Sequence, residues 1–343
     1  MNVNWMIIHH VKIFGEMGVL NMVKVGIVGA GKRYKSLYKS VLESFGDKIN
    51  IIGFVTNSGK LSSEVGDYKV FTSIRELCDY DKPDFLISVV PFHATPSILK
   101  DACSLKCDIL VETPVGNLNE SYPILNNIQT SGITAGVIEQ WPFLPMECFK
   151  KKLIDGGILG KIHLAENDYR TYDYHGVAQL RNYLGKDSNF VDIKGKTKKQ
   201  YPLNGSGDTW DIIMAELDNG TTLLYKYTSL YKRVKVRNFK SIRVYGDKGT
   251  IISDCLLDND IEKFSIIWND GETYHLDINK IYSKNLEEIN TTLPDGSVIK
   301  WENKFKDYEL DEHQIAIAQH IDSMINGKVL WTVEDGFKDL QIL

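Results

Sequence analysis

Two glycines near the start of the chain have the spacing of a dinucleotide-binding turn. The segment VGIVGAG (25–31) ends an apolar run at Val28 and places Gly29 and Gly31 before a helical pattern. The first glycine permits a tight turn, and the second lets backbone N–H groups approach a pyrophosphate at the helix N-terminus. The third glycine of the G-x-G-x-x-G pattern is absent, because Tyr34 stands there. The pattern predicts a bound dinucleotide; a glycine turn without a ligand is the alternative.

The residues after the second apolar run bear on which dinucleotide is bound. An acidic side chain at this place would bind the ribose 2′-hydroxyl of NAD. Here the run ends instead in Thr56, Asn57 and Ser58. These neutral side chains, together with Lys32 and Arg33 in the first helical turn, are able to accept a 2′-phosphate. The sequence therefore favours NADP over NAD.

The elements that must position this turn alternate between apolar strands and amphipathic helices over residues 22–140. Such strands, separated by helices, are typical of a parallel sheet covered on both faces. Right-handed crossovers then give a doubly wound Rossmann domain, in which ligands bind at the carboxyl edge of the sheet. We therefore expect further cofactor contacts from Ala30 and from Val90, Pro91 and His93 after the fourth strand. For His93, capping its own loop is the alternative.

The pattern changes after Pro145, where strands follow one another with little helix between them. Turn pairs such as Gly246-Asp247 separate these strands, as hairpins require. Residues 141–325 are predicted to form an α+β domain with a mostly antiparallel sheet, and residues 326–343 are candidates to pack back on the first domain. Residues 1–21 are expected to be an N-terminal extension. The lysine-rich run KGKTKK (194–199) is interpreted as a solvated loop rather than a phosphate-binding patch.

Composition excludes several classes of protein. The chain has 343 residues, of which 43% are apolar and 25% charged, and its net charge of −5 argues against a broad nucleic-acid-binding face. Five cysteines without a CxxC pair indicate reduced thiols in the cytoplasm and no metal site. No run approaches the roughly 18 apolar residues of a membrane span.

Taken in order, the motifs resemble those of the glucose–fructose oxidoreductase/inositol dehydrogenase/MocA (Gfo/Idh/MocA) family. The resemblance extends from Val23 over nearly the whole chain. Its markers are VGIVGAGKR (25–33), VVPFHAT (89–95), VETP (111–114), GVIEQ (136–140), LIDGGILGKI (153–162) and HGVAQLRNYLG (175–185). The resemblance implies NAD(P)-dependent hydride transfer on a sugar-like or related carbonyl, alcohol or imine. It also implies a homo-oligomer formed through the C-terminal sheet.

When the family's motifs are matched residue by residue, the positions of the active site are present, but most of its charged residues are replaced. The family's Glu-Lys-Pro turn stands here as Glu112, Thr113 and proline, so the turn remains on the cofactor side without its lysine. The family's catalytic histidine matches His175. The aspartates expected four residues before it and three after it fall on Thr171 and Ala178.

His175 is the residue to which the resemblance assigns proton transfer. An imidazole can take the hydroxyl proton during oxidation and return it during reduction. A helix-start histidine that bonds the backbone is the alternative. Tyr174 and Asp173 are further catalytic candidates, and Asp173 is also a candidate to orient the imidazole.

Substrate contacts are expected from the same stretch of the chain. Tyr172 offers a hydrogen-bonding group, while Arg170 and Arg181 would suit an anionic group of the substrate. A surface or helix-pairing charge is the alternative for each arginine. Two other functions remain open beside the oxidoreductase, namely a cofactor-binding protein without turnover and a redox-neutral enzyme that retains its cofactor.

Overall fold

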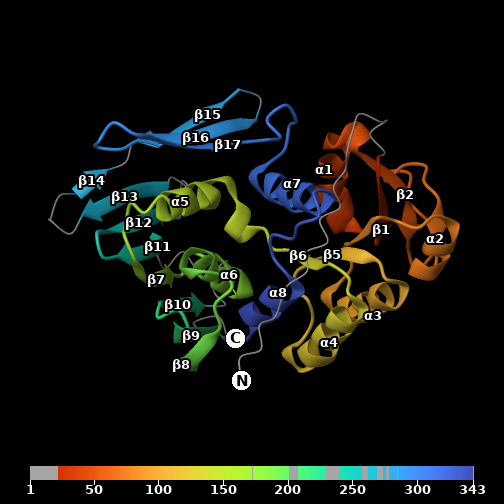
Figure 1. Ribbon diagram of the computed structural model, residues 1–343, viewed down its shortest axis with the longest axis horizontal. Helices are drawn as coiled ribbons and strands as arrows, with labels where there is room; N and C mark the ends of the chain where they lie inside the picture. The colour runs from red at the N-terminus through yellow and green to blue at the C-terminus, as the bar shows by residue number, and fades with distance from the viewer. Residues whose placement is uncertain are drawn as a thin grey trace, which may run out of the picture.

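Two large sheets, one parallel and one mixed, lie at opposite sides of the molecule with helices between them (Figure 1). The computed structural model describes residues 22–171, 173–200, 208–228, 239–256, 262–268, 273–275, 278–283 and 285–342. No helix in this part of the chain combines the length and apolar composition that crossing a bilayer requires.

The N-terminal sheet is the doubly wound parallel sheet that the sequence predicts. Its six strands lie in the order β3-β2-β1-β4-β5-β6, so β2 and β3 are added on one side of β1 and β4 to β6 on the other. Every pairing between them is parallel. The strands are β1 (Val23–Val28), β2 (Ile49–Val55), β3 (Val70–Phe71), β4 (Phe85–Ser88), β5 (Asp108–Glu112) and β6 (Ala135–Ile138).

Helices cover both faces of this sheet because its strands are apolar on both faces. Two buried clusters result, one on each side of the strands. The covering elements are α1 (Lys39–Ser44), α2 (Ile74–Tyr80), α3 (Thr95–Leu105) and α4 (Ser121–Ser131), with the short turns η2 (Gly46–Lys48), η3 (Phe92–Ala94) and η4 (Leu118–Glu120).

The helix after β1 is not regular. A π-helical segment, η1 (Tyr34–Tyr38), precedes α1, and the N–H of Lys39 donates to the carbonyl of Tyr34 five residues back. Tyr34 occupies the place of the missing third glycine, and its buried ring contacts Phe54 of β2 at 5.2 Å between centroids. A glycine at this position would let the helix and the strand approach closely. The π-helical turn thus occurs where the bulky ring of Tyr34 stands instead.

The C-terminal sheet contains eight strands in the order β14-β13-β12-β11-β7-β10-β9-β8. All pairings are antiparallel except that of β7 with β10, so the expected mostly antiparallel sheet is confirmed. The strands are β7 (Ile162–Asp168), β8 (Phe190–Gln200), β9 (Asp208–Leu217), β10 (Thr222–Thr228), β11 (Phe239–Gly246), β12 (Gly249–Leu256), β13 (Glu262–Trp268) and β14 (Thr273–His275).

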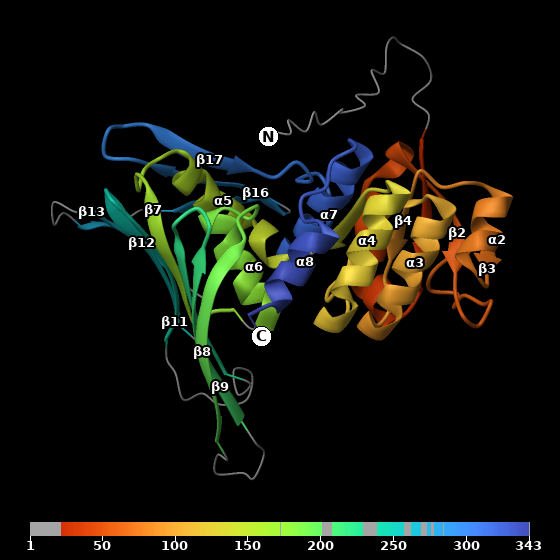
Figure 2. The ribbon, with the colours of Figure 1, turned by 60° about the horizontal axis from the view of Figure 1, so that its bottom comes forward.

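One face of this sheet packs on helices and the other is exposed. Helices α5 (Pro145–Asp155) and α6 (Asp173–Leu184) lie between the sheet and the rest of the molecule (Figure 2). Along β9 the buried Ile213 alternates with Ile212 and Met214, which are 52% and 39% exposed. This alternation is the period of two that a sheet covered on one face requires.

The interpretation of residues 194–199 as a loop is wrong. They belong to β8, the edge strand of the large sheet, which pairs with β9 along most of its length. Lys194, Lys196 and Lys198 are exposed, as a solvated run would be, but hydrogen bonding to β9 makes the segment a strand despite its polarity. Lysines on an edge strand discourage pairing with another chain.

A third, smaller sheet was not predicted from the sequence. Its three antiparallel strands are β15 (Asn279–Tyr282), β16 (Leu286–Thr292) and β17 (Val298–Glu302). The buried face of this sheet contributes Leu286, Ile289 and Trp301 to the core that also contains Phe149 of α5.

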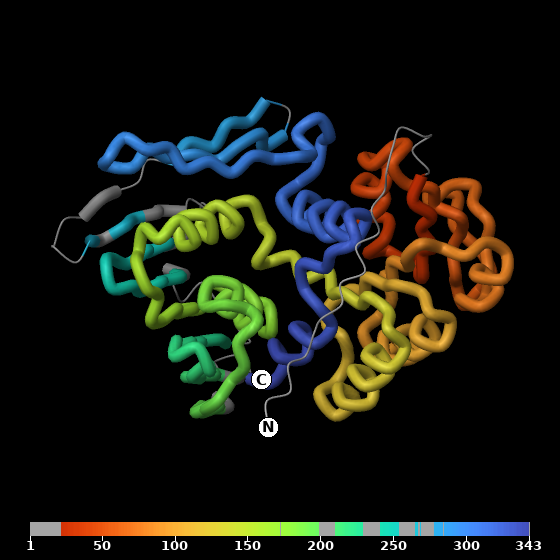
Figure 3. The backbone as a smooth tube through the Cα atoms, viewed as in Figure 1, coloured from red at the N-terminus to blue at the C-terminus, as the bar shows by residue number. Residues whose placement is uncertain are grey.

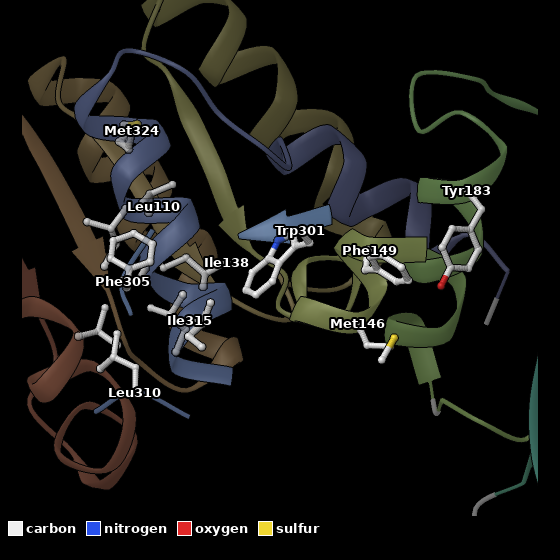
Figure 4. Packing of buried hydrophobic residues seen from close by; sticks show 14 of the residues in the cluster. Leu110, Ile138, Met146, Phe149, Tyr183, Trp301, Phe305, Leu310, Ile315 and Met324 are labelled. Atoms are coloured by element: carbon white, nitrogen blue, oxygen red, sulfur yellow. The ribbon is translucent and has the colours of Figure 1, made fainter. Parts of the chain in front are cut away.

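The last two helices, α7 (Glu312–Ile325) and α8 (Val333–Leu340), return the chain to the junction of the two halves (Figure 3). The backbone N–H of Val137 in β6 donates to the carbonyl of Trp331, so the end of the chain does pack on the first sheet. Figure 4 shows Ile315 and Met324 of α7 beside Leu110 and Ile138 of the parallel sheet, in one cluster with Trp301 and Phe149. One apolar core therefore joins the two halves.

Candidate functional site

The glycine turn stands at the carboxyl end of β1 with the shape that a dinucleotide requires. Gly29 has φ +94°, and its N–H donates to the carbonyl of Val55 at 2.9 Å. A Cβ on Gly29 would lie 2.5 Å from the carbonyl oxygen of Val89, so only glycine fits. A Cβ on Gly31 would meet no atom within 4 Å. The backbone at Gly31 therefore faces open space into which a pyrophosphate can approach, and the residues present fit a dinucleotide.

The other expected cofactor residues gather along the same edge of the sheet. Because β1 lies between β2 and β4, its carboxyl end is the switch point at which ligands bind in such sheets. Around it lie the three groups of residues after β1, β2 and β4: Ala30 and Lys32; Thr56, Asn57 and Ser58; Val90, Pro91 and the exposed His93. The hydroxyls of Thr56 and Ser58 both donate to the carbonyl of Lys60 at 3.3 Å, which ties this loop together.

Arg33 does not point toward the loop after β2, where the sequence analysis placed it. Its Nε and Nη2 donate to the two carboxylate oxygens of Glu112 at 3.1 and 3.2 Å. Glu112 also accepts hydrogen bonds from the hydroxyl of Tyr38 at 2.5 Å and from Gln140 at 3.3 Å. Burial and the adjacent Glu112 raise the pKa of Tyr38, so this hydroxyl stays protonated and donates. The buried Glu112 therefore anchors the irregular helix after β1 to the end of β5.

Thr113 at the end of β5 meets the second half of the molecule. Its side chain forms a hydrogen bond with the hydroxyl of Tyr174, at the start of α6. Burial raises the pKa of Tyr174, so the hydroxyl is neutral at physiological pH. The position that carries lysine in the resembling family is thus filled here by two neutral hydroxyl groups, one from each half.

His175 lies one residue further along α6 and contacts the end of β6. Its Nδ1 lies 2.8 and 2.9 Å from the two carboxylate oxygens of Glu139. The imidazole ring lies 4.3 Å from the ring of Tyr174 and 5.8 Å from that of Trp141, measured between centroids. Its side chain is 12% exposed, whereas that of Glu139 is 1% exposed. A carboxylate from the first half therefore meets an imidazole from the second.

The start of α6 is held by buried polar groups. Thr171 donates its N–H to the side chain of Asn167 at 2.9 Å, and its hydroxyl donates to Gln179 at 2.5 Å. Asp173 has φ +54°, and its carbonyl accepts a hydrogen bond from Tyr225 at 2.9 Å. Burial raises the pKa of Asp173. The carboxylate of Asp173 bonds the N–H of Tyr174, so the carboxylate on the imidazole is that of Glu139 instead.

Arg181 is not a substrate ligand. Its side chain is fully buried and donates to the carboxylates of Asp335 and Asp339, both on α8. Arg181 therefore pairs α6 with α8, which is the alternative that the sequence left open. Arg170 is half-buried and lies just before α6. Tyr172 lies outside the described residues.

Several polar residues at the junction were missed by the sequence analysis. Glu139 and Gln140 directly follow a buried parallel strand, a position that by itself indicates the ligand edge of the sheet. His313 and His320 of α7 are seven residues apart on one helix, a spacing that a buried helix face also produces. Nδ1 of His313 lies 3.0 Å from Gln140, and Nε2 of His320 donates to the carbonyl of Glu139 at 2.8 Å.

The assembled site places groups that can exchange protons at the carboxyl edge of the parallel sheet. It combines an open glycine turn, two neutral hydroxyls and an imidazole held by a buried carboxylate. Among the described residues, no three His, Cys, Asp or Glu side chains come together as a metal-binding group.

Comparisons with known proteins agree with this fold. No family model matches the chain. An uncharacterized protein of Saccharomyces cerevisiae is 22% identical over 266 residues, which cover 68% of this chain and 75% of the yeast protein.

The solved structures that share the fold include oxidoreductases and a dehydrogenase. An oxidoreductase from Thermotoga maritima has a TM-score of 0.63 at 17% identity, over 93% of this chain and 94% of that one. An oxidoreductase from Agrobacterium radiobacter, solved with NAD+, L-tartaric acid and magnesium, has a TM-score of 0.65 at 13% identity, over 93% and 94%. The WlbA dehydrogenase from Bordetella pertussis, solved with NADH and UDP-GlcNAcA, has a TM-score of 0.65 at 14% identity, over 93% of each chain.

Proposed function

We propose that this chain is an NAD(P)-dependent oxidoreductase of the Gfo/Idh/MocA family that acts on a small polar alcohol, carbonyl or imine. The observation that carries the proposal is the meeting of two features at one sheet edge. The glycine turn after β1 leaves open space at Gly31, and His175 with Tyr174 reaches the ends of β6 and β5 from the other half. The similar structures solved with NAD+ and NADH support the nucleotide.

The residues divide the chemistry between them. The nicotinamide, when bound, supplies the hydride acceptor or donor. The turn at Gly29, Ala30 and Gly31 binds its pyrophosphate through backbone N–H groups. His175 takes the hydroxyl proton of the substrate during oxidation and returns it during reduction. The hydroxyls of Thr113 and Tyr174 hydrogen-bond the substrate oxygen from the position that carries lysine in the resembling family.

The rest of the junction contributes to substrate recognition in this proposal. Arg170 and Tyr172 precede α6 and are proposed to contact the substrate, while Asp173 orders the start of the helix through Tyr174. Glu112 acts on the cofactor side by holding Arg33.

NADP remains the proposed cofactor, although with fewer supporting residues than the sequence analysis counted. Thr56, Asn57 and Ser58 present no carboxylate to repel a 2′-phosphate, and Lys32 is exposed at the first helical turn. Arg33 is bonded to Glu112 and is no longer proposed to contact the 2′-phosphate. Fluorescence titration with NADPH and NADH tests the preference, and much tighter binding of NADH would contradict it.

The test of the function is turnover followed by cofactor absorbance across a panel of sugars, cyclitols, hydroxy acids and imines. His175→Ala should then lower kcat by about 10²–10⁴-fold, the usual contribution of a positioned acid or base. Cofactor affinity should change little, because the glycine turn lies in the other half. A fully active His175→Ala enzyme would refute the proton-transfer role.

The missing lysine supports a second candidate, a cofactor-binding protein without turnover. Neither hydroxyl at Thr113 and Tyr174 brings the positive charge that would stabilise a developing alkoxide. Binding of NADP(H) with no hydride transfer on any member of the panel would favour this candidate. A cofactor that never exchanges while substrate is converted would instead favour redox-neutral chemistry.

The exposed face of the large sheet is proposed to bury itself against a second copy of the chain. Ile212 and Met214 of β9 lie on this face beside the ion pairs of Glu166 with Lys226 and Arg243. Scattered charges around exposed apolar side chains suit a paired sheet face. Met214→Lys should shift the protein toward the monomer in analytical ultracentrifugation, and a monomeric wild type would refute the pairing.

A further inference from the structure

The carboxylate that holds His175 comes from an unexpected part of the chain. In the resembling pattern an aspartate would stand four residues before the histidine, but that position is Thr171. Thr171 is fully buried, and its hydroxyl is bonded to Gln179. The carboxylate that contacts Nδ1 of His175 belongs to Glu139, which is 36 residues earlier and at the end of β6. The imidazole and its carboxylate thus come from different halves of the molecule.

We propose that Glu139 is a positioning residue for His175, and that it sets which ring nitrogen exchanges the substrate proton. The inference rests on the proposed function. A carboxylate only accepts hydrogen bonds, so Nδ1 of His175 carries the proton in this contact. The neutral ring then has its lone pair on Nε2. During oxidation the substrate O–H bond would break and its proton would bond to Nε2. The C–H bond of the carbon that bears this oxygen would break as well, its hydride would pass to a bound nicotinamide, and a C=O bond would remain.

The contacts of Glu139 suit this role. The backbone N–H of Trp141 donates to the same carboxylate at 3.1 Å, and His320 donates to its backbone carbonyl at 2.8 Å. The first bond holds the carboxylate of Glu139 and the second holds its backbone, independently of the imidazole. When Nε2 accepts a proton, the positive charge on the ring forms 2.8 to 2.9 Å from a buried negative charge. A carboxylate in this relation to a histidine holds the tautomer and stabilises the imidazolium.

The consequence is that Nε2 is selected as the proton acceptor only when the two halves are docked. Glu139 follows β6 of the parallel sheet, whereas His175 begins α6 under the large sheet. A buried carboxylate that merely caps the N–H of Trp141 would leave the imidazole unaffected. The state of the His175 ring therefore separates a positioning role from a structural one.

The first experiment measures the tautomer of His175 by long-range ¹H–¹⁵N NMR on the full chain labelled at histidine. The His175 signals are assigned by their loss in His175→Gln. We expect a protonated Nδ1 in the wild type. In Glu139→Gln the amide can donate to Nδ1, so the population should shift toward the Nε2–H tautomer. A wild-type ring protonated on Nε2 alone would overturn the proposal, and this reading needs neither a folded Glu139 variant nor a substrate.

The second experiment compares three variants on a substrate found by the panel. Glu139→Gln should lower kcat by about 10²–10⁴-fold with KM changed by only a few-fold, as loss of the orienting carboxylate predicts. Glu139→Asp should recover part of the loss. The matched control is Glu147→Gln, because Glu147 is also buried, on α5, but bonds Lys150 and the hydroxyl of Tyr183 rather than an imidazole. This control should lower the melting temperature and leave both the His175 tautomer and kcat per folded enzyme unchanged.

The outcomes separate the two proposals. An unchanged His175 tautomer and kcat in Glu139→Gln would make Glu139 structural, whatever the activity of the enzyme. A fully active His175→Ala enzyme would refute the proposed function while the NMR result on Glu139 stands. If no substrate is turned over, the tautomer measurement still decides the role of Glu139.

Discussion

Thr113 is a neutral residue in a polar part of the junction between the two halves. The resembling pattern puts lysine at this position, and the carboxylates of Glu112 and Glu139 both act on the neighbouring Tyr174. In this structure Glu112 is bonded to Arg33 and Glu139 to His175. An ammonium at position 113 would find its acidic neighbours already engaged and would replace the hydrogen bond to Tyr174. The neutral pair of hydroxyls is therefore consistent with its surroundings.

The Thr113 variants test this pairing. Thr113→Val keeps the shape but removes the hydrogen bond to Tyr174, so kcat/KM should fall by about 3–10-fold, the value of one ordinary hydrogen bond. Thr113→Lys should weaken cofactor or substrate binding, since the new charge lacks a partner. Steady-state kinetics and cofactor titration measure both effects. A Thr113→Lys enzyme with higher dehydrogenase activity than wild type would show that the site had not been rebuilt.

His320 gives the protein a predictable sensitivity to acid. Burial lowers the pKa of His320 from 6.5 to about 4. Its Nε2 donates to the carbonyl of Glu139, and its buried Nδ1 has no hydrogen-bond partner among the described residues. Below pH 6.5 the unfolded chain binds a proton that the folded chain refuses until about pH 4. The contribution of His320 to stability is therefore complete above pH 6.5 and is lost as the pH falls through this window.

The prediction is a lower melting temperature at pH 5.0 than at pH 7.5, with a loss of at most about 1.4 kcal/mol per pH unit from this group. His320→Gln retains a donor for the carbonyl of Glu139 but cannot titrate, so its melting temperature should depend less on pH. The exposed His163→Gln serves as the control and should behave as wild type. Equal pH dependence in His320→Gln and wild type would show that burial of this ring is not responsible.

At the scale of elements, the turn between β1 and the helix combines a structural glycine with a binding one. Gly29 is required by its φ of +94° and by the carbonyl of Val89, whereas Gly31 faces open space. The helix that follows is π-helical around Tyr34, and its Arg33 and Tyr38 both bond Glu112. In this turn Gly29 is required for the backbone conformation and Gly31 faces the proposed ligand. The bonds to Glu112 hold the helix to β5.

Alanine variants of the two glycines should separate these roles. Gly31→Ala should melt within about 2 °C of wild type, since its Cβ meets nothing, but should weaken NADPH binding by roughly tenfold or more, or about 1.4 kcal/mol. Gly29→Ala should lower both the melting temperature and the affinity, because of strain and the clash with Val89. Thermal melts and NADPH titration of both variants provide the test. Unchanged affinity in Gly31→Ala would place the nucleotide elsewhere.

At the scale of the whole molecule, the two halves are joined by the C-terminal helices. Helix α7 adds Ile315 and Met324 to the core shared by both sheets. Helix α8 lies against α6, where the buried Arg181 reaches Asp335 and Asp339. Because α6 also carries His175, the position of the catalytic candidate depends on this ion-paired contact.

Arg181→Ala should destabilise the protein by about 3–5 kcal/mol, because it leaves two buried carboxylates without their cation. Cofactor affinity of the folded fraction should stay near wild type, as Arg181 is remote from the glycine turn. The exposed Arg75→Ala is the control and should change stability by no more than about 0.5 kcal/mol. Chemical unfolding measures both variants. A stable Arg181→Ala protein with a raised KM for an anionic substrate would instead indicate that Arg181 binds the substrate.

The sequence by itself determined the elements whose signal is local. The glycines of the first turn, the apolar parallel strands and the alternation along strands such as β9 are each encoded within about ten residues. These patterns were sufficient to predict the doubly wound domain, the mostly antiparallel sheet and the edge at which a nucleotide would lie.

Only the tertiary structure decided which side chains meet. Arg33 and Glu112 are 79 residues apart, and His175 and Glu139 are 36 apart, so each pair forms only once strand order and the docking of the halves are set. For the same reason Arg181, which the sequence offered as a substrate contact, forms buried ion pairs with α8. The lysine-rich run likewise forms an edge strand. Local propensity ranks the conformations of a segment, but long-range pairing supplies the free energy that selects among them.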